Sequence, residues 1–237
     1  MQSQKKLIIT VGPQGSGNHI FARILSMHPE VFGWKSLKKH YFLKHSSEPF
    51  AEYFIYPQLL TSDFFGKDYS FFVSNSSFPV GFQGVFHTPK ILEFAAAAKS
   101  FGIDVQIAVI IRDEDIVRTQ QLRTRKKTTV DAAKEYINDV LIPSEFPVHF
   151  LSLETFFSLK QTYLKYVSNM LNFPIDYKNP EILTFIEESP NKKYITPIDK
   201  YWLDKWNHQG VAVEEFLNPE IQQSRLIVNQ RRIHPYE

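Results

Sequence analysis

The chain has 237 residues, 43% of them hydrophobic and 15% aromatic, which is enough for one α/β domain with a large buried core. Its formal net charge is only +2, from 27 basic and 25 acidic residues, so charge does not indicate a nucleic-acid or membrane partner. The absence of cysteine excludes disulfides, thiolate metal sites and cysteine nucleophiles. The apolar stretch before Gly12 is too short for a signal peptide or membrane anchor, and we expect a soluble, cytoplasmic protein.

Short apolar runs alternate with amphipathic segments along the chain. The runs predict buried strands at residues 7–11, 80–86, 105–111 and 148–151. The amphipathic segments predict helices at about 18–27, 89–100, 114–126, 130–141, 154–171 and 179–188. Apolar strands that alternate with helices are typical of a parallel sheet covered on both faces. We therefore predict an α/β fold, a three-layer sandwich with a central, mostly parallel sheet, in a single domain over residues 1–237.

Two segments depart from this alternation. Residues 36–79 contain aromatics and short polar clusters, which predict an insertion packed over the sheet or a lid over an acceptor site. Residues 218–237 form a C-terminal extension that matches no motif, and packing on a partner chain is one use for it. The oligomeric state stays open.

A glycine-rich loop, VGPQGSGNH, lies between the first predicted strand and the first predicted helix. Gly12 and Gly17 are spaced as in the ATP-binding pattern G-x-x-x-x-G-K-[ST], in which backbone N–H groups and a helix start hold phosphate. The Lys that reaches the phosphates and the Ser/Thr that holds Mg²⁺ are replaced here by Asn18 and His19. The loop therefore predicts a phosphate site without metal-dependent hydrolysis of a triphosphate. The alternative is a glycine-rich turn with no ligand.

The stretch GSGNHIFARILSMHPEV resembles the opening of the sulfotransferase family, in which a strand, a G-x-x-[KRG]-[ST]-G-[TN] loop, a helix and an L-x-x-H-P-x-V turn follow in order. Members of that family resemble P-loop kinases in fold. They use 3′-phosphoadenosine 5′-phosphosulfate (PAPS) and need no metal. The resemblance implies a nucleotide pocket lined by Gly15, Ser16, Gly17, Asn18 and His19, to which the phosphate-loop spacing adds Gly12. His28 lies in a His-Pro turn, a position that favours a cap on the helix end over a ligand contact.

Gly15 departs from the family's pattern. Many members carry Lys or Arg there, and that cation neutralises the bridging oxygen as the sulfuryl group leaves. Loss of such a donor costs roughly 3 kcal/mol in comparable electrostatic sites. Another cation must compensate, or transfer is weak or absent, and the candidates are His19, Lys35 and Lys90.

The strand predicted at 105–111 runs into IRDEDIVRTQQLRTRKK. An Arg at the carboxyl end of a strand can make a two-pronged contact with phosphate that Lys would not reproduce. In the family the equivalent strand ends in an Arg, followed about two helical turns later by a Ser, and the pair holds the 3′-phosphate. The resemblance implies Arg112 for this role, with Thr119 or Gln120 at the Ser position. The alternative is an Arg paired with a neighbouring aspartate on the surface.

Five basic residues follow Arg112 in this segment. They form either a solvated helix face or a basic wall that attracts an anionic nucleotide or a polyanionic acceptor. These residues are Arg118, Arg123, Arg125, Lys126 and Lys127.

The segment GVFHTPKILEF resembles the H-x-P step that carries the catalytic base in the cytosolic sulfotransferases. A base is needed because the acceptor hydroxyl loses its proton as it attacks sulfur, and a neutral imidazole titrates in the useful range. The resemblance implies His87 as this base, and His19 is a second catalytic candidate. A helix cap or a core histidine is the alternative for His87, in which case Glu48 or Glu52 could serve.

The segment SPNKKYITPID resembles the basic RKYP-x-x-D segment of the heparan-type sulfotransferases, whose cations close over the 3′-phosphate. Lys192, Lys193 and Tyr194 are the matching positions. The histidines show no metal-binding spacing, so we expect no metal site.

These features predict a sulfotransferase that moves a sulfuryl group from PAPS to a hydroxyl or amine of an unknown acceptor, a small molecule or a carbohydrate. One alternative is a sulfotransferase-like protein that binds the nucleotide without turnover, which Gly15 supports. The other is a P-loop small-molecule kinase, against which Asn18 and His19 speak.

Overall fold

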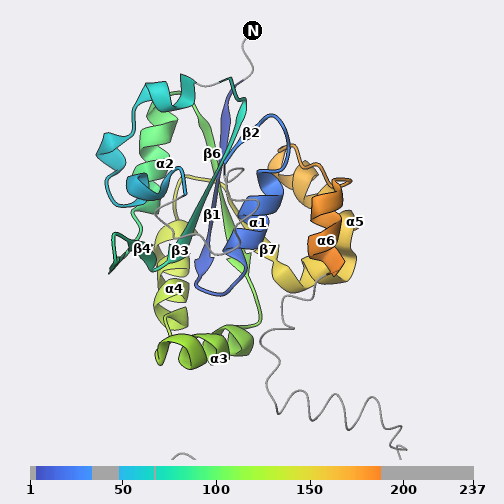
Figure 1. Cartoon of the computed structure of the whole chain (residues 1–237). Coiled ribbons are helices and arrows are strands. Elements are labelled where there is room, and N and C mark those ends of the chain that lie inside the picture. Colours follow the sequence, from blue (N-terminus) through green and yellow to red (C-terminus); the bar gives the residue numbers. More distant parts are fainter. Residues whose placement is uncertain (1–3, 34–47, 67, 188–237) are drawn as a thin grey trace, which may run out of the picture. The chain divides into compact units, whose positions relative to one another are not determined.

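Five parallel strands form the central sheet of the computed structural model, which describes residues 4–33, 48–66 and 68–187 (Figure 1). The strand order is β2-β3-β1-β6-β7. The strands are β1 (Lys6–Pro13), β2 (Val31–Phe32), β3 (Phe71–Phe78), β6 (Asp104–Ile111) and β7 (Val148–Ser152). The central strand β1 is buried from Lys6 to Gly12, which explains why its sequence reads as a continuous apolar run.

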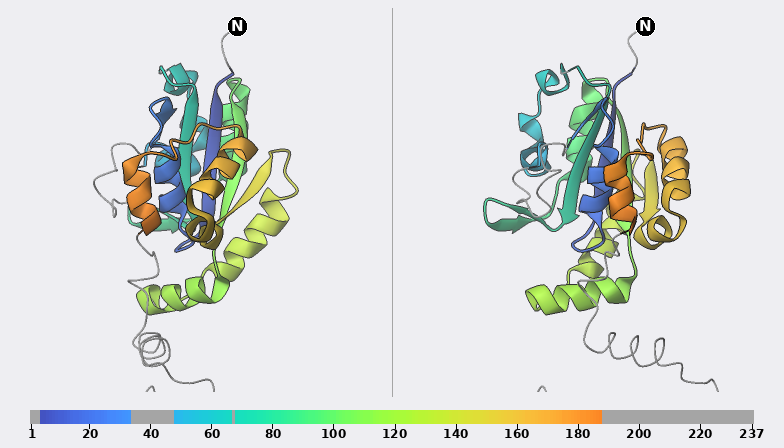
Figure 2. Two further views of the ribbon diagram at one scale, coloured as in Figure 1. Left: turned by 90° about the vertical axis from the view of Figure 1, so that its right-hand side faces the viewer. Right: turned by 45° about the vertical axis from the view of Figure 1, so that its right-hand side comes forward.

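Helices cover both faces of this sheet (Figures 1 and 2). One face carries α1 (Asn18–Leu25), α5 (Leu153–Leu171) and α6 (Pro180–Glu187). The other carries α2 (Ile91–Ser100) and α4 (Val130–Tyr136), which continues as the π-helical turn η6 (Ile137–Leu141). Side chains alternate along β1, so Ile8 packs in the first core and Leu7 and Ile9 pack in the second. The helix α3 (Glu114–Arg125) lies across the carboxyl ends of the strands.

This architecture confirms the predicted α/β fold with three layers and a parallel sheet. The strands predicted at 7–11, 105–111 and 148–151 are β1, β6 and β7, and all six predicted helices are present. Their ends differ from the predictions by a few residues, as helix and strand termini commonly do. None of the described helices is both long and apolar enough to cross a bilayer.

The prediction of a buried sheet strand at 80–86 was wrong. These residues form a separate antiparallel hairpin of β4 (Val80–Phe82) and β5 (Val85–His87). Its turn, Gln83–Gly84, has φ values of 48° and 83°, the positive range that a tight two-residue hairpin turn requires. Because the turn divides the apolar run, only one strand of the hairpin is buried, and Val85 and Phe86 are exposed.

The prediction that an insertion extends from 36 to 79 was wrong at its C-terminal end, because residues 71–78 form β3 beside β1. Residues 51–66 do pack over the sheet, as the short helices η3 (Ala51–Phe54), η4 (Pro57–Leu59) and η5 (Ser62–Gly66). The strand β3 escaped prediction because its second half is a run of buried polar residues, Ser74, Asn75, Ser76 and Ser77. Such a run does not resemble a buried strand in the sequence.

The described residues all belong to one unit, residues 1–189. The predicted C-terminal extension, 218–237, lies outside the described residues, as do Lys35, Lys192, Lys193 and Tyr194. A single domain over the whole chain stays a prediction.

Candidate functional site

The glycine-rich loop and Arg112 follow two neighbouring strands. β1 and β6 pair from Lys6 opposite Asp104 to Val11 opposite Val109, so their carboxyl ends lie side by side. The chain leaves β1 toward β2 and β3 on one side, and it leaves β6 toward β7 on the other. Connections that diverge in this way leave a crevice at the strand ends, which is where ligands bind in open α/β sheets.

The loop adopts a conformation that requires glycine at two positions. Gly15 and Gly17 have φ values of 97° and 101°, in the left-handed region that other residues rarely adopt. A Cβ atom on Gly17 would also lie 2.9 Å from Cδ1 of Leu153 on α5. The loop therefore curls tightly into the start of α1, which begins at Asn18 without a side-chain cap.

The carbonyl groups of this loop are bound by surrounding protein. Four consecutive carbonyls accept hydrogen bonds: Gly12 from Asn18 Nδ2 (2.9 Å), Pro13 from the Ser16 N–H (3.1 Å), Gln14 from Gln121 Nε2 (2.7 Å) and Gly15 from Arg112 Nη1 (2.8 Å). The C=O and N–H of one trans peptide point in opposite directions. Within the described part of the chain, no acceptor takes the N–H of Gly15, Gly17 or Asn18. These donors, at the positive end of α1, form a cradle suited to an anion.

The side chain of Asn18 is part of the loop's support. It is buried, and Nδ2 donates to the carbonyls of Gly12 (2.9 Å) and Ser76 on β3 (3.2 Å). Its Oδ1 lies 2.7 Å from the hydroxyl of Ser16, which also lies 2.8 Å from the Pro13 carbonyl. Both side chains, predicted to line the pocket, are thus bonded within the loop. Asn18 offers a ligand its backbone N–H.

Arg112 and Gln120 meet at the loop. Arg112 Nη1 contacts both the Gly15 carbonyl (2.8 Å) and Gln120 Oε1 (3.3 Å). The Gln120 amide lies over Gly15, since a Cβ atom there would be 2.9 Å from Oε1 and 3.3 Å from Nε2. Thr119, the other residue proposed for the family's Ser position, is exposed. The structure therefore brings Gln120, and not Thr119, into contact with Arg112.

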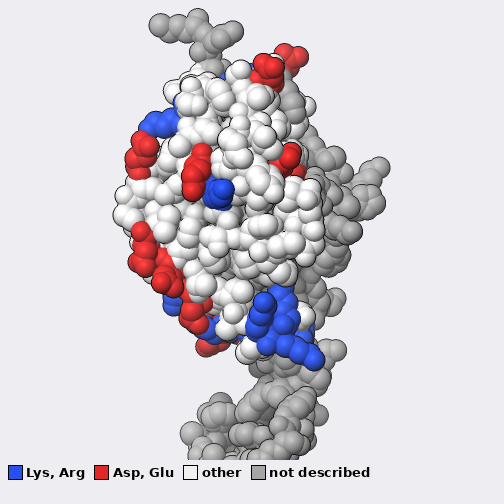
Figure 3. All heavy atoms as spheres, turned by 90° about the vertical axis from the view of Figure 1, so that its left-hand side faces the viewer, with Lys and Arg blue, Asp and Glu red and all other residues white. Residues whose placement is uncertain are grey.

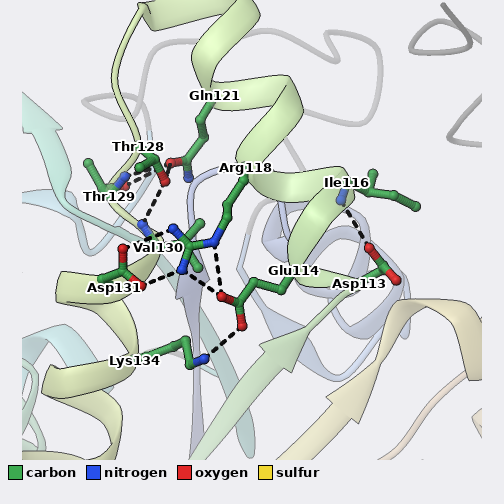
Figure 4. A network of polar contacts seen from close by, with 10 residues as sticks. All are labelled: Asp113, Glu114, Ile116, Arg118, Gln121, Thr128, Thr129, Val130, Asp131 and Lys134. Carbon is green, nitrogen blue, oxygen red and sulfur yellow. Dashed lines mark hydrogen bonds and ion pairs between the residues drawn. The ribbon is translucent and has the colours of Figure 1, made fainter. Parts of the chain in front are cut away.

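A network of ion pairs holds α3 against α4 (Figure 4). Arg118 donates to Glu114 Oε1 (2.6 Å) and to the carboxylate of Asp131, and Lys134 Nζ lies 2.7 Å from Glu114 Oε2. Hydrogen bonds from these cations lower the pKa of Glu114 and of Asp131. Gln121, fully buried, completes the attachment, because its Oε1 accepts from the Thr129 N–H (2.7 Å) while its Nε2 binds the loop. The loop's partners on α3 are consequently fixed in place.

The five basic residues predicted as a solvated face or a basic wall separate into two groups. Arg118 belongs to the ion-pair network, and its contacts are with acidic side chains. The others are exposed at the end of α3, and Figure 3 shows Lys and Arg side chains gathered at the same end of the molecule. These exposed residues are Arg123, Arg125, Lys126 and Lys127.

The two catalytic candidates occupy different elements. His19 is half-buried in the first turn of α1. His87 is half-buried on the hairpin, where it pairs with Val80 of the neighbouring strand. Among the described residues, no hydrogen bond joins its side chain to the loop. The base of the hairpin does touch the loop, since Gln14 Nε2 donates to the carbonyl of Pro79 (3.1 Å).

Glu48, one of the two glutamates suggested as the base in place of His87, has a structural role. Its carboxylate is buried and accepts from the N–H groups of Phe50 (2.8 Å) and Asn75 (3.2 Å), where β3 extends beyond β2. Burial raises its pKa well above the usual value for glutamate. Glu52 and Lys90 are exposed, and His28 Nδ1 accepts from the Glu30 N–H (3.3 Å) in a turn.

Sequence reasoning missed Gln14 and Gln121, which join the loop to the hairpin and to α3. The available signal was the Gln120–Gln121 pair, since two adjacent buried amides on a helix of charged residues need polar partners.

In comparisons with known proteins, no family model and no curated protein matches the chain. Among the described residues, no group of three His, Asp or Glu side chains is placed to hold a metal ion.

Proposed function

We propose that this protein binds PAPS at the 12–18 loop and transfers its sulfuryl group to a hydroxyl or amine acceptor. The observation that carries the proposal is the loop's own bonding. Four of its carbonyls are bound to protein, while the N–H groups of Gly15, Gly17 and Asn18 have no acceptor among the described residues. The side chain of Asn18, at the usual Lys position, is a structural support. Such a loop suits a phosphate held by backbone alone, without the Lys and Mg²⁺ ligand that ATP chemistry needs.

Arg112 supports the choice of a nucleotide with a second phosphate. It follows the strand next to β1 and contacts the Gly15 carbonyl, so its guanidinium group lies beside the loop. A planar guanidinium suits bidentate contact with phosphate oxygens. We assign it to the 3′-phosphate that distinguishes PAPS from adenylyl sulfate.

The proposed reaction is an in-line displacement at sulfur. The acceptor oxygen or nitrogen forms a bond to sulfur, the bond from sulfur to the bridging oxygen breaks, and adenosine 3′,5′-bisphosphate leaves with that electron pair. The acceptor's proton passes to a base, for which His87 is the candidate. The acceptor is a small molecule or a carbohydrate.

A second candidate is nucleotide binding without turnover. The observation that favours it is Gln120, whose amide fills the space over Gly15 where the resembling family carries a cation. A neutral donor stabilises a leaving anhydride oxygen less than a cation does.

Calorimetry with adenosine 3′,5′-bisphosphate, PAPS and ATP/Mg²⁺ side by side tests the proposal. We expect the 3′-phosphorylated nucleotides to bind the wild type and to lose affinity in Arg112→Ala, with the exposed Arg125→Ala as the matched control. Preference for ATP/Mg²⁺ would indicate a kinase and contradict both candidates. Transfer of labelled sulfate to a panel of acceptors, lost in His87→Ala, separates turnover from binding alone.

A further inference from the structure

The amide of Gln120 has an orientation that its neighbours determine. Arg112 Nη1 is a donor, so the atom 3.3 Å from it must be the Gln120 oxygen. Both ends of the amide lie over Gly15, with Nε2 3.3 Å from where a Cβ atom would be, and no described residue accepts a hydrogen bond from this Nε2. The residue is only 9% exposed, and its amide places two N–H donors next to Gly15, whose backbone N–H also has no described acceptor.

The loop therefore has neutral amides at two places where phosphate loops usually carry cations. Asn18 stands at the Lys position of the ATP-binding pattern, and the Gln120 amide fills the space over Gly15. Arg112 reaches this region at the Gly15 carbonyl. Apart from the Arg112 guanidinium, whose Nη1 is bonded to the Gly15 carbonyl and to Gln120, these N–H donors are uncharged.

Neutral donors distinguish phosphates by their charge. A phosphate inside an anhydride or a diester carries one negative charge at neutral pH. A terminal monoester carries between one and a half and two, because its second ionisation falls near pH 6. The additional charge makes removal from water more costly, and only a nearby cation offsets that cost effectively.

We propose that Gln120 donates a hydrogen bond to the phosphate in the loop, and that this neutral cradle prefers a singly charged, anhydride-linked 5′-phosphate to a terminal 5′-phosphate. The inference rests on the proposed function. It predicts that the site prefers the substrate nucleotide to the product nucleotide, since the 5′-phosphate is anhydride-linked in PAPS and becomes a terminal monoester in the product. The cradle then binds PAPS more tightly than adenosine 3′,5′-bisphosphate, which favours product release.

Two ligands isolate the 5′-phosphate: adenosine 3′,5′-bisphosphate and its 5′-methyl ester. Both carry the same 3′-phosphate, and only the first has a second ionisation at the 5′ position. We expect the wild type to bind the methyl ester more tightly at pH 8 in calorimetry. The difference should shrink at pH 5.5, where protonation reduces the charge of the bisphosphate's 5′ group.

Variants at position 120 test whether the Gln120 N–H group donates a hydrogen bond to the phosphate. Gln120→Leu should weaken binding of the methyl ester about three- to tenfold, the usual worth of one hydrogen bond. Gln120→Lys should shift the preference toward the bisphosphate, because a cation stabilises the doubly charged group. Thr119→Val, at the exposed neighbouring position, is the matched control and should change neither affinity.

The outcomes distinguish this inference from the proposed function. If the wild type binds neither nucleotide, the proposed function fails and the inference fails with it. If it binds both equally at pH 8, or if Gln120→Leu behaves like Thr119→Val while the melting temperature is unchanged, only the inference is overturned. If the Gln120→Leu protein is destabilised, the deciding measurement is the affinity for the two ligands, compared between the wild type and Gln120→Lys.

Discussion

Replacing Asn18 by alanine should destabilise the fold, because its amide supports the loop from inside. The substitution removes both donors to the carbonyls of Gly12 and Ser76 and the acceptor for the Ser16 hydroxyl. Buried polar groups left without a partner cost about 1–3 kcal/mol each, and strand carbonyls that keep another hydrogen bond lie at the low end. We therefore expect a loss of about 2–3 kcal/mol in the free energy of unfolding. For a domain of this size that corresponds to roughly 4–12 °C in melting temperature.

Urea unfolding followed by far-ultraviolet circular dichroism measures this loss. Thr119→Ala is the control, since Thr119 is exposed on α3. It should cost less than about 1 kcal/mol, the usual range for an exposed substitution. If Asn18→Ala kept the wild-type stability but lost affinity for adenosine 3′,5′-bisphosphate, the side chain would be a ligand contact and the reasoning would be refuted.

Three further predictions concern glycine geometry, a buried acid and the α3 clamp. Gly17→Ala should cost more stability than Gly84→Ala, by about 1 kcal/mol or more, because both have positive φ but only Gly17 would also press on Leu153; equal losses in urea unfolding would contradict the contact. Because burial raises the pKa of Glu48 in the folded state, its contribution to stability is complete below the unfolded-state pKa and declines as pH rises toward the folded value. Wild-type stability should therefore fall between pH 5 and pH 8 relative to Glu48→Gln, and parallel curves would show that the acid does not titrate in this way. Lys134 and Arg118 lower the pKa of Glu114, and Arg118 lowers the pKa of Asp131, so acidification from pH 5 to pH 3 should destabilise the wild type more than Arg118→Met.

The sheet shows which parts of this fold the sequence could predict. β1 and β6 are continuous apolar runs in the middle of the sheet, so their burial on both faces is visible in composition alone. β3 lies equally deep, but its second half is polar because it pairs with the loop region and meets Asn18 and Glu48. Those partners come from distant segments. No local pattern reveals that such a polar run is satisfied inside the protein.

The candidate site also has features that the sequence could predict and features that it could not. The spacing of Gly12 and Gly17 and the position of Arg112 after a strand could be found in sequence, since both depend on the local order of strand, loop and helix. The internal role of Asn18 could not be found, because the same residue at that position could equally have faced a ligand. The choice of Gln120 over Thr119 depended on which side of α3 faces the loop. The packing of α3 on α4 decides that.

The bonded carbonyls of the loop have a consequence for binding kinetics and entropy. Groups from α1, α3 and the end of β6 hold successive peptides of the loop through hydrogen bonds from the protein itself. The conformational freedom of these residues is thus lost during folding, and an arriving phosphate need not restrict it again. Association with a small anion should consequently be rapid, with little ordering of the chain. Even dimethyl phosphate, a singly charged phosphodiester that has no adenosine to contribute binding energy, should protect the amide hydrogens of the loop from exchange.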